Sequence, residues 1–388
     1  MFLFDILAYV LFAIIMSNLA RKSECITIDS DKWDRYLKWY VMFFTFVAAI
    51  RWNVGSDSIS YAIGFAKGLS SDARPEFLWQ WLVDTIHNLD IHWTIGMGFV
   101  AFLQIFFIVK SVKRYRFILI MLPFVLFGGR YWLDMMGGMR QMIVACGFLW
   151  ASKFIYEKKL WKYLLFVFIA AQIHRSAFIL IPFYFIPNSF QIENKRILLI
   201  IILILCCLIG QTPAYQGMIG YIEAISNLIG YEDYTARVGD MLMKERTSEA
   251  LAFGPMMLTY LLIPIFLLWF GPRLKQVYGE VIPYFNLWYN LAYFYACIYF
   301  LVCNISHIFI RPVMYFSLFQ MIMAALLLYE LLKSARRNSN MQWTFIIFAF
   351  IIFTNSAWDI YKASGRKWES TTYKVFFMHW DQISLFKM

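Results

Sequence analysis

Four short polar motifs interrupt an otherwise apolar sequence, each at the edge of an apolar segment. They are RWNVGSDSISY at 51–61, GGMRQ at 137–141, HRS at 174–176 and HIFIRP at 307–312. Every motif contains an arginine, and three of them add a carboxylate or an imidazole. Guanidinium groups form paired hydrogen bonds with phosphate oxygens and stay charged at any physiological pH. Together the motifs predict a site that binds a diphosphate.

Four arginines are the cations predicted to bind this diphosphate: Arg51, Arg140, Arg175 and Arg311. For any one of them, the alternative is a side chain that extends to lipid phosphate at the membrane surface. Four arginines on one face of the membrane are harder to explain in that way. Gln141, next to Arg140, is a further candidate for substrate binding.

Asp57 and His174 are the candidate general bases. Asp57 precedes a helix expected to begin near Ser58, so a structural N-cap is the alternative. His174 lies at an expected break between two short helices, and a neutral imidazole there could act as a base near neutral pH. Its alternative is a hydrogen-bonded structural histidine. The other four histidines show no metal-ligand spacing and are interpreted as structural.

Glu76 follows Pro75 at the start of an expected amphipathic helix over 75–89. A carboxylate is favourable in the first turn of a helix, and this is its structural interpretation; Glu76 is also a candidate for substrate binding. Tyr61 is a candidate for stacking on a sugar. Three other aromatic residues share that role, with anchoring at the membrane interface as the alternative: Trp52, Tyr131 and Trp132.

The composition is that of an integral membrane protein. Of 388 residues, 61% are hydrophobic and 15% charged, against about 25% charged in soluble domains. The mean hydropathy of +0.61 leaves no room for a large water-soluble domain. The formal charge of +11 is interpreted as an excess of basic residues in cytoplasmic loops, so no nucleic acid is expected as a partner. The six cysteines lack zinc-ligand spacing, and we expect free thiols and no cofactor.

Twelve apolar segments are expected to cross the membrane as helices. They lie near residues 2–19, 37–51, 93–110, 117–133, 139–155, 161–173, 176–187, 197–210, 253–271, 282–303, 312–332 and 341–357. The expected fold class is therefore an all-α polytopic membrane protein with outward-facing amphipathic helices. Because neither an internal repeat nor a linker divides the chain, residues 1–388 are expected to form one transmembrane domain.

The distribution of basic residues predicts the orientation. If the first loop, 21–38, is cytoplasmic, the six loops on that side hold 20 of the 35 Lys and Arg residues within 62 positions. The termini then lie outside, and the extracytoplasmic segments 52–92 and 211–252 cover the site. One alternative stays open, in which 161–187 is a single tilted helix and everything downstream is inverted. The density of basic residues favours two half-length helices that meet at His174.

The same stretches match the pattern of a known family in order and spacing. They are RWNVGSDSISYAIGF at 51–65, PEFLWQWL at 75–82, the run from GGMRQ to IPFYF at 137–185, and IRPVMYF at 310–316. In these stretches the sequence resembles the EpsG-type family of exopolysaccharide and O-antigen polymerases, which are Wzy-like membrane proteins. Ser56 stands where the family pattern has Thr.

The resemblance implies a membrane glycosyltransferase with an architecture like that of the GT-C enzymes. It would transfer a growing glycan from polyprenyl diphosphate to a lipid-linked repeat unit, at the outer face of the bacterial cytoplasmic membrane. Donor and acceptor would both be polyprenyl-diphosphate-linked oligosaccharides, and a chain-length regulator is a candidate partner. Because the segments expected on the outer side contain no Asp-x-Asp pair to hold a divalent ion, catalysis is expected to be metal-independent, with arginines stabilising the leaving group.

Two other functions remain open. A lipid-linked oligosaccharide flippase would use the arginines only to bind diphosphate, and should show two pseudo-symmetric halves that this sequence lacks. A polysaccharide O-acyltransferase would use His174 to activate a sugar hydroxyl. Its histidine should then face a cytoplasmic acyl donor or a relay partner, whereas His174 is expected on the outer side.

Overall fold

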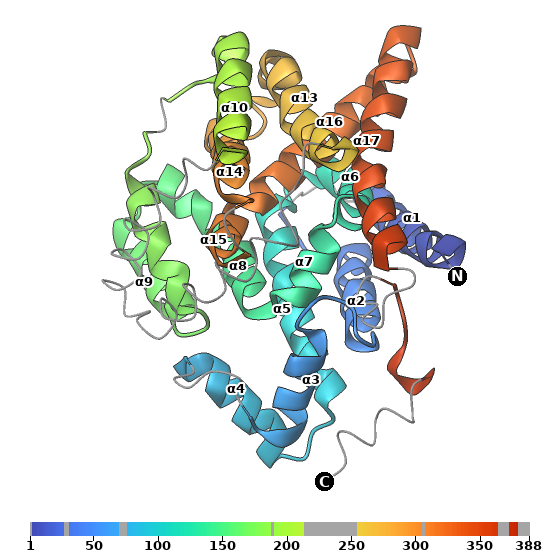
Figure 1. Ribbon diagram of the computed structural model, residues 1–388, viewed down its shortest axis with the longest axis vertical. Helices are drawn as coiled ribbons and strands as arrows, with labels where there is room; N and C mark the ends of the chain where they lie inside the picture. The colour runs from blue at the N-terminus through green and yellow to red at the C-terminus, as the bar shows by residue number, and fades with distance from the viewer. Residues whose placement is uncertain are drawn as a thin grey trace. The chain divides into compact units, whose positions relative to one another are not determined.

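The described part of the chain is almost entirely helical. The computed structural model describes residues 2–26, 31–69, 76–187, 190–212, 254–304, 307–363 and 372–378 (Figure 1). These residues belong to two compact units, Met1–Asn188 with Met321–Met388, and Ser189–Gln320. The expected segment 211–252 lies almost wholly outside the described residues.

The first unit contains most of the polar motifs. Its helices are α1 Phe2–Ile26, α2 Arg35–Ala49, α3 Ser58–Lys67, α4 Phe77–Asn88, α5 Trp93–Val112, α6 Arg116–Gly128, α7 Tyr131–Gly137, α8 Met139–Tyr156, α9 Leu160–Ala171, the 3-10 helix η1 Arg175–Phe185, α17 Ser339–Ala363 and η5 Phe376–Met378. α16, Ser317–Ala335, begins in the second unit and continues in the first.

The second unit is built around α14. Its elements are η2 Glu193–Lys195, α10 Arg196–Gly210, α13 Pro255–Tyr278, α14 Phe285–Val302, α15 His307–Val313 and η4 Met314–Phe316. α14 packs against α10 and α13. Its polar side chains donate to main-chain oxygens of neighbouring segments: Asn290 Nδ2 to Phe190 O at 2.8 Å and Tyr293 OH to Leu199 O at 3.0 Å. These bonds satisfy polar groups among apolar helices, where an unpaired group is costly.

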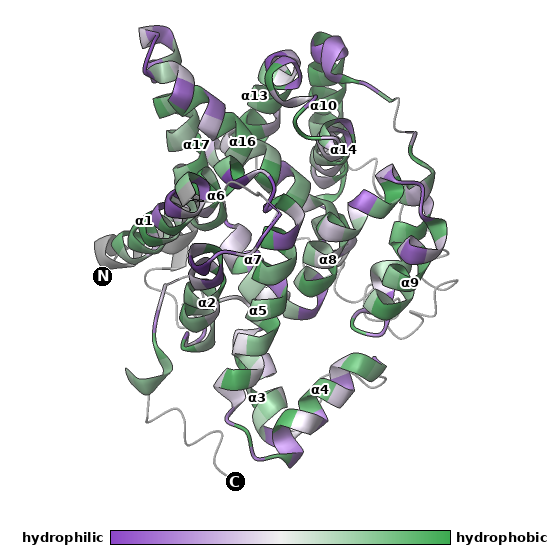
Figure 2. Cartoon of the chain, turned by 180° about the vertical axis from the view of Figure 1, so that it is seen from behind, coloured by the Kyte–Doolittle hydropathy of each residue, from purple (hydrophilic) through white to green (hydrophobic). Residues whose placement is uncertain are grey.

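Apolar helices support a multi-pass membrane protein, but twelve spans are not confirmed. Within the described residues, four segments are long and apolar enough to cross a membrane: Ile6–Cys25, Trp93–Val112, Pro255–Tyr278 and Ile310–Ala335. Seven further expected spans coincide with helices that are shorter or less apolar, namely α2, α8, α9, η1, α10, α14 and α17. Figure 2 shows hydrophobic residues over much of these helices.

The prediction of one continuous span at 117–133 is wrong, because two helices occupy this range. α6 and α7 are bent by 70° at a short break, so they make at most one broken span. The break falls at Gly129 and Arg130, and Arg130 has a φ of 71°, in the left-handed region. A residue in that conformation cannot continue a right-handed helix. The bend directs α7 toward the turn that precedes α3.

A buried ion pair joins α1, α2 and α6. Asp34 caps α2, where its carboxylate accepts from the main-chain nitrogens of Tyr36 at 2.7 Å and Leu37 at 3.0 Å. The same carboxylate pairs with Arg116 at 2.5 Å and accepts from Ser23 Oγ at 2.6 Å. Because the charge is both paired and hydrogen-bonded, it is tolerated in the interior. The network fixes the start of α2, which leads to the first polar motif.

α9 and η1 form a hairpin, which confirms the break expected at His174. Lys158, before α9, donates to Ile186 O, after η1, at 3.1 Å. Tyr163 of α9 donates to Leu180 O of η1 at 2.6 Å. The two arms therefore run antiparallel, and the single tilted helix over 161–187 is excluded. With 12 and 11 residues, the arms measure about 18 and 22 Å, shorter than the hydrocarbon layer of about 30 Å.

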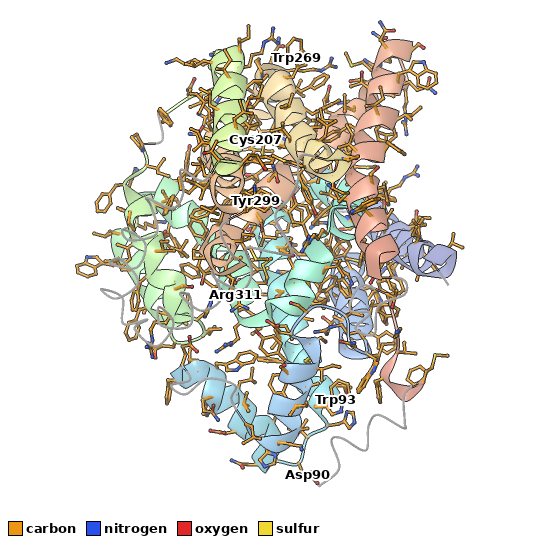
Figure 3. All side chains as sticks on the ribbon, viewed as in Figure 1. Asp90, Trp93, Cys207, Trp269, Tyr299 and Arg311 are labelled. Carbon is orange, nitrogen blue, oxygen red and sulfur yellow. The ribbon has the colours of Figure 1, made fainter. Side chains whose placement is uncertain are left out.

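α3, α4 and α5 pack together at one end of the first unit (Figure 1). The expected amphipathic helix over 75–89 is present as α4, whose buried face is Trp79, Val83 and Ile86. Phe77 and Trp81 of the same helix are exposed. Trp93, marked in Figure 3 at the start of α5, belongs to the same apolar cluster as Trp79. This cluster also includes Met139, so it supports the start of α8.

The hairpin predicts membrane accessibility at three positions. In a variant without native cysteines, Glu157→Cys and Pro187→Cys lie at the open end of the hairpin and should share one side of the membrane. Ser56→Cys, in the exposed part of the first motif, should lie on the other side. In intact cells, an impermeant maleimide should label position 56 alone, and the other two only after permeabilisation. Opposite labelling of positions 157 and 187 would contradict the hairpin.

Candidate functional site

Arg51 holds the turn between α2 and α3. The side chain is 1% exposed. Its guanidinium donates to the main-chain oxygens of Ala48 and of Val54, the latter at 3.4 Å, and its Nη2 lies 3.2 Å from Met139 Sδ. In this conformation the guanidinium donates its hydrogen bonds to main-chain carbonyls and contacts Met139, the first residue of α8. Its predicted role in diphosphate binding stays a prediction, which would require the guanidinium to exchange these partners.

Gly55 brings the first motif into direct backbone contact with the second. Its φ is 94°, and a Cβ added there would lie 2.3 Å from Gly137 N and 2.4 Å from Met136 C. Only glycine avoids both the strain of this conformation and the clash. On the opposite side of the junction between α7 and α8, Gln104 of α5 donates to the carbonyls of Met135 at 3.1 Å and Met139 at 3.2 Å. The junction of α7 and α8 is therefore held on two sides.

Arg140 lies in the first turn of α8. A cation is unfavourable there because the amide groups at a helix N-terminus carry a partial positive charge. Its Nη1 pairs with Glu76 Oε2 at 2.9 Å, and its guanidinium lies 5.7 Å from the centre of the Trp79 ring. The side chains of Arg140 and Glu76 are only 13% and 10% exposed. The pair is thus largely shielded from water and ties α8 to α4.

The tip of the hairpin meets the same carboxylate. Glu76 Oε1 accepts from the main-chain nitrogen of Arg175 at 3.1 Å and lies 3.5 Å from His174 Nδ1. The carbonyl of Gln172 in turn accepts from the first residues of α4, Leu78 N at 2.9 Å and Trp79 N at 3.3 Å. Side-chain and main-chain bonds therefore join α4 to the hairpin tip.

We call Glu76, Trp79, Arg140 and His174 the Glu76 cluster. Burial by itself would raise the pKa of Glu76, but the hydrogen bonds from His174 and the Arg175 main chain, with the charge of Arg140, lower the pKa to about 2. The carboxylate is therefore ionised at neutral pH. The cluster combines a fixed anion, a guanidinium and an imidazole, a set that can bind an anionic group and exchange a proton.

Tyr61 lies beside the cluster, whereas the other aromatic candidates do not offer open rings. The half-buried Tyr61 ring packs edge-on against Trp79, with ring centres 5.5 Å apart. Trp52, Tyr131 and Trp132 are buried, so their rings are not open to a sugar in this structure. Because a stacking residue must expose a ring face, only Tyr61 of the four keeps that possibility here.

Asp57 takes the N-cap position of α3, as expected, but its carboxylate makes no capping hydrogen bond. The structure therefore does not show the capping bond that was the structural alternative for Asp57. Gln141 is 4% exposed, and its Nε2 has no hydrogen-bond partner within the described residues. The guanidinium of Arg175 makes no ion pair within that part of the chain. Arg311 is exposed on α15, which belongs to the second unit.

Metal ligands do not gather in the described part of the chain. Among those residues, no three His, Cys, Asp or Glu side chains come close enough to hold a metal ion. All six cysteines are free thiols, as predicted. Metal independence itself remains a prediction.

A comparison with protein families identifies the chain's relatives. The EpsG family model matches residues 34–370, which include all four polar motifs. The chain belongs to the EpsG family. This membership confirms the resemblance and points to a polysaccharide polymerase of the exopolysaccharide type. No curated protein and no solved structure matches the chain.

Glu76 is the cluster residue whose contacts the sequence did not reveal. It was expected as a favourable carboxylate in the first turn of a helix, yet it makes no capping bond and pairs instead with Arg140 and His174. These partners lie 64 and 98 positions away. The available signal was its place within the PEFLWQWL stretch that resembles the EpsG-type family.

Gly55→Ala should disrupt the site. The added Cβ meets main-chain atoms of Gly137 and Met136 that cannot move independently of α7. We expect a marked loss of folded protein, measured by expression and by size-exclusion chromatography in detergent. Gly138→Ala is the matched control, because its Cβ would approach nothing closer than 3.5 Å. Normal folding of both variants would contradict the tight contact.

Glu76 should make stability depend on pH. Its folded-state pKa of about 2 lies below the ordinary value of 4.5, so the stabilisation is complete above pH 4.5 and is lost as pH falls toward 2. The difference in Tm between the wild type and Glu76→Gln should be constant at neutral pH and shrink below pH 4.5. Asp31, whose pKa is also lowered, is present in both proteins and cancels. A difference that does not change with pH would contradict the assignment.

Proposed function

We propose that this EpsG-family protein polymerises a polysaccharide by transferring a growing glycan from polyprenyl diphosphate to a lipid-linked repeat unit. The reaction would take place at the outer face of the bacterial cytoplasmic membrane. The main support is the Glu76 cluster, in which one carboxylate contacts both a predicted diphosphate ligand, Arg140, and a predicted base, His174. Family membership supports the same reaction class.

The residues divide between two tasks. Arg140 and Arg175 stabilise the diphosphate, together with Arg311 and Arg51 where these can reach it, and Gln141 and Tyr61 contact the substrate. The acceptor hydroxyl gives its proton to His174 while its oxygen bonds to the anomeric carbon of the donor. The bond from that carbon to the phosphate oxygen breaks, and its electron pair leaves with polyprenyl diphosphate. Guanidinium groups fixed near the departing charge lower the barrier without needing a metal ion.

His174 is preferred to Asp57 as the base because it shares a carboxylate with Arg140, next to the proposed diphosphate site. Asp57 is proposed to orient the substrate or an arginine. A general base contributes roughly 10² to 10⁴ in rate. His174→Gln should therefore leave only single-repeat glycan in cells. If Asp57→Asn abolishes polymer and His174→Gln does not, the two roles are exchanged.

A glycan gel from a deletion strain tests the function directly. Loss of the polymerase leaves single repeats on the lipid carrier, and restoring the gene restores the ladder. Loss of a flippase leaves no surface glycan, and loss of an O-acyltransferase leaves a full ladder without acetyl groups. Either of the last two outcomes would overturn the proposal.

Arg140→Lys should lower polymer formation by about tenfold or more, since lysine keeps the charge but loses the guanidinium fork. Arg114→Lys is the matched control, because Arg114 is 60% exposed in a pair with Asp31 away from the cluster. Both variants should be expressed normally. Repeat units polymerised by purified protein, counted on gels, provide the measurement. Equal activity of the two variants would favour a structural role for Arg140.

Excess EDTA should leave this purified reaction unchanged. The physical reason is that the proposed charge stabilisation comes from guanidinium groups and not from a bound cation. The test compares polymer length with and without chelator, using identical lipid-linked substrate. Inhibition by EDTA that one particular divalent ion reverses would contradict the prediction and would make Asp57 a candidate ligand.

A further inference from the structure

We propose that Glu76 is a positioning residue for glycosyl transfer, one that holds the His174 imidazole by Nδ1 and leaves Nε2 to take the proton of the acceptor hydroxyl. The proposal rests on the function proposed above and adds a role for a residue that does not itself touch the reacting atoms. Its starting point is the 3.5 Å contact between Glu76 Oε1 and His174 Nδ1. Such contacts are often long before substrate binds.

The two oxygens of Glu76 have separate partners. Oε2 accepts from Arg140 Nη1 at 2.9 Å, and Oε1 accepts from the main-chain nitrogen of Arg175 at 3.1 Å. The Arg140 pair and the main-chain bond hold the carboxylate in place without any help from His174. A carboxylate fixed in this way can orient an imidazole, whereas one that moved with the ring could not.

His174 has little else to fix its ring. Its backbone is extended, with φ −152° and ψ 111°, between the end of α9 and the start of η1. No helical turn therefore restricts the side chain. Nε2 makes no hydrogen bond within the described residues, and the side chain is 17% exposed. The contact with Glu76 thus decides which nitrogen is available to a substrate.

The negative charge of Glu76 has a second effect on the proton transfer to His174. The charged groups that meet at the hairpin tip are Glu76 at the start of α4 and Arg140 of α8, and Arg175 of η1 adds its main-chain nitrogen. A protonated imidazole near a guanidinium group is unfavourable unless an anion lies close by. Glu76 is that anion, so it stabilises the imidazolium that forms when the acceptor hydroxyl loses its proton.

The same geometry separates catalysis from substrate binding. Glu76 neutralises part of the charge of Arg140, so removing the carboxylate leaves that guanidinium more available to a diphosphate. A variant that loses Glu76 should therefore lose turnover without losing affinity for the donor. General weakening of the structure would impair both.

Glu76→Gln in the full-length protein tests the role, with Asp84→Asn as matched control. Asp84 is a carboxylate on the same helix that accepts from Gln80 at 2.7 Å, outside the cluster. We expect Glu76→Gln to lower kcat by about 10- to 100-fold, within the range of general-base effects, with the KM for lipid-linked repeat unit unchanged or lower. Asp84→Asn should behave as wild type.

A double-mutant cycle shows whether Glu76 acts through His174. In the His174→Gln background, adding Glu76→Gln should cost less than twofold, because the proton acceptor is already gone. Equal losses in both backgrounds would overturn the proposal, as would a KM that rises in parallel with the loss of kcat. If Glu76→Gln does not fold, Glu76→Asp keeps the charge but withdraws it by one methylene, and the same cycle applies.

The controls separate this proposal from the proposed function. If the wild-type protein polymerises repeat units and Glu76→Gln matches it in kcat and KM, only the role of Glu76 fails. If the deletion strain keeps its full ladder and purified wild type makes no polymer, the proposed function fails first.

Discussion

The ion pair between Glu76 and Arg140 is the interaction on which the described site depends. Arg140 occupies the first turn of α8, where the helix dipole disfavours a cation, and its side chain is shielded from water. A shielded cation in that position requires a nearby anion. Glu76 supplies it from the start of α4 and, with its other oxygen, engages the tip of the α9–η1 hairpin. One carboxylate thus joins three segments that are distant in sequence.

The support for this pair is made of main-chain contacts. Gly55 lies against Gly137, Gln104 bonds to carbonyls on both sides of the α7–α8 break, and Arg51 bonds to the carbonyls of its own turn. Main-chain positions cannot adjust independently as side chains can, so the start of α8 is well defined. Two of the arginine motifs therefore have different physical roles here: Arg51 stabilises the turn, and Arg140 presents its charge to the cluster.

The hairpin explains why a polar motif can occur inside an apolar stretch. Each arm is shorter than the hydrocarbon layer, and polar backbone at membrane depth is tolerated only where protein or water satisfies it. At residues 172–175 the partners are supplied by α4 and Glu76. The break that separates α9 from η1 is thus also the place where His174 and Arg175 reach the cluster, so fold and proposed chemistry have the same cause.

The sequence by itself determined the membrane class, the EpsG-type resemblance and the position of nearly every helix, and it favoured the break at His174, because these depend on local hydropathy and on the order of short motifs. Only the tertiary structure decided that the expected span at 117–133 is broken, that Arg51 is buried, and that Trp52 and Trp132 are not open to a sugar. Only it decided that Glu76 pairs with Arg140 and His174. Local patterns report which side chains are charged or apolar, whereas a counter-ion 64 or 98 positions away is set by how the helices pack.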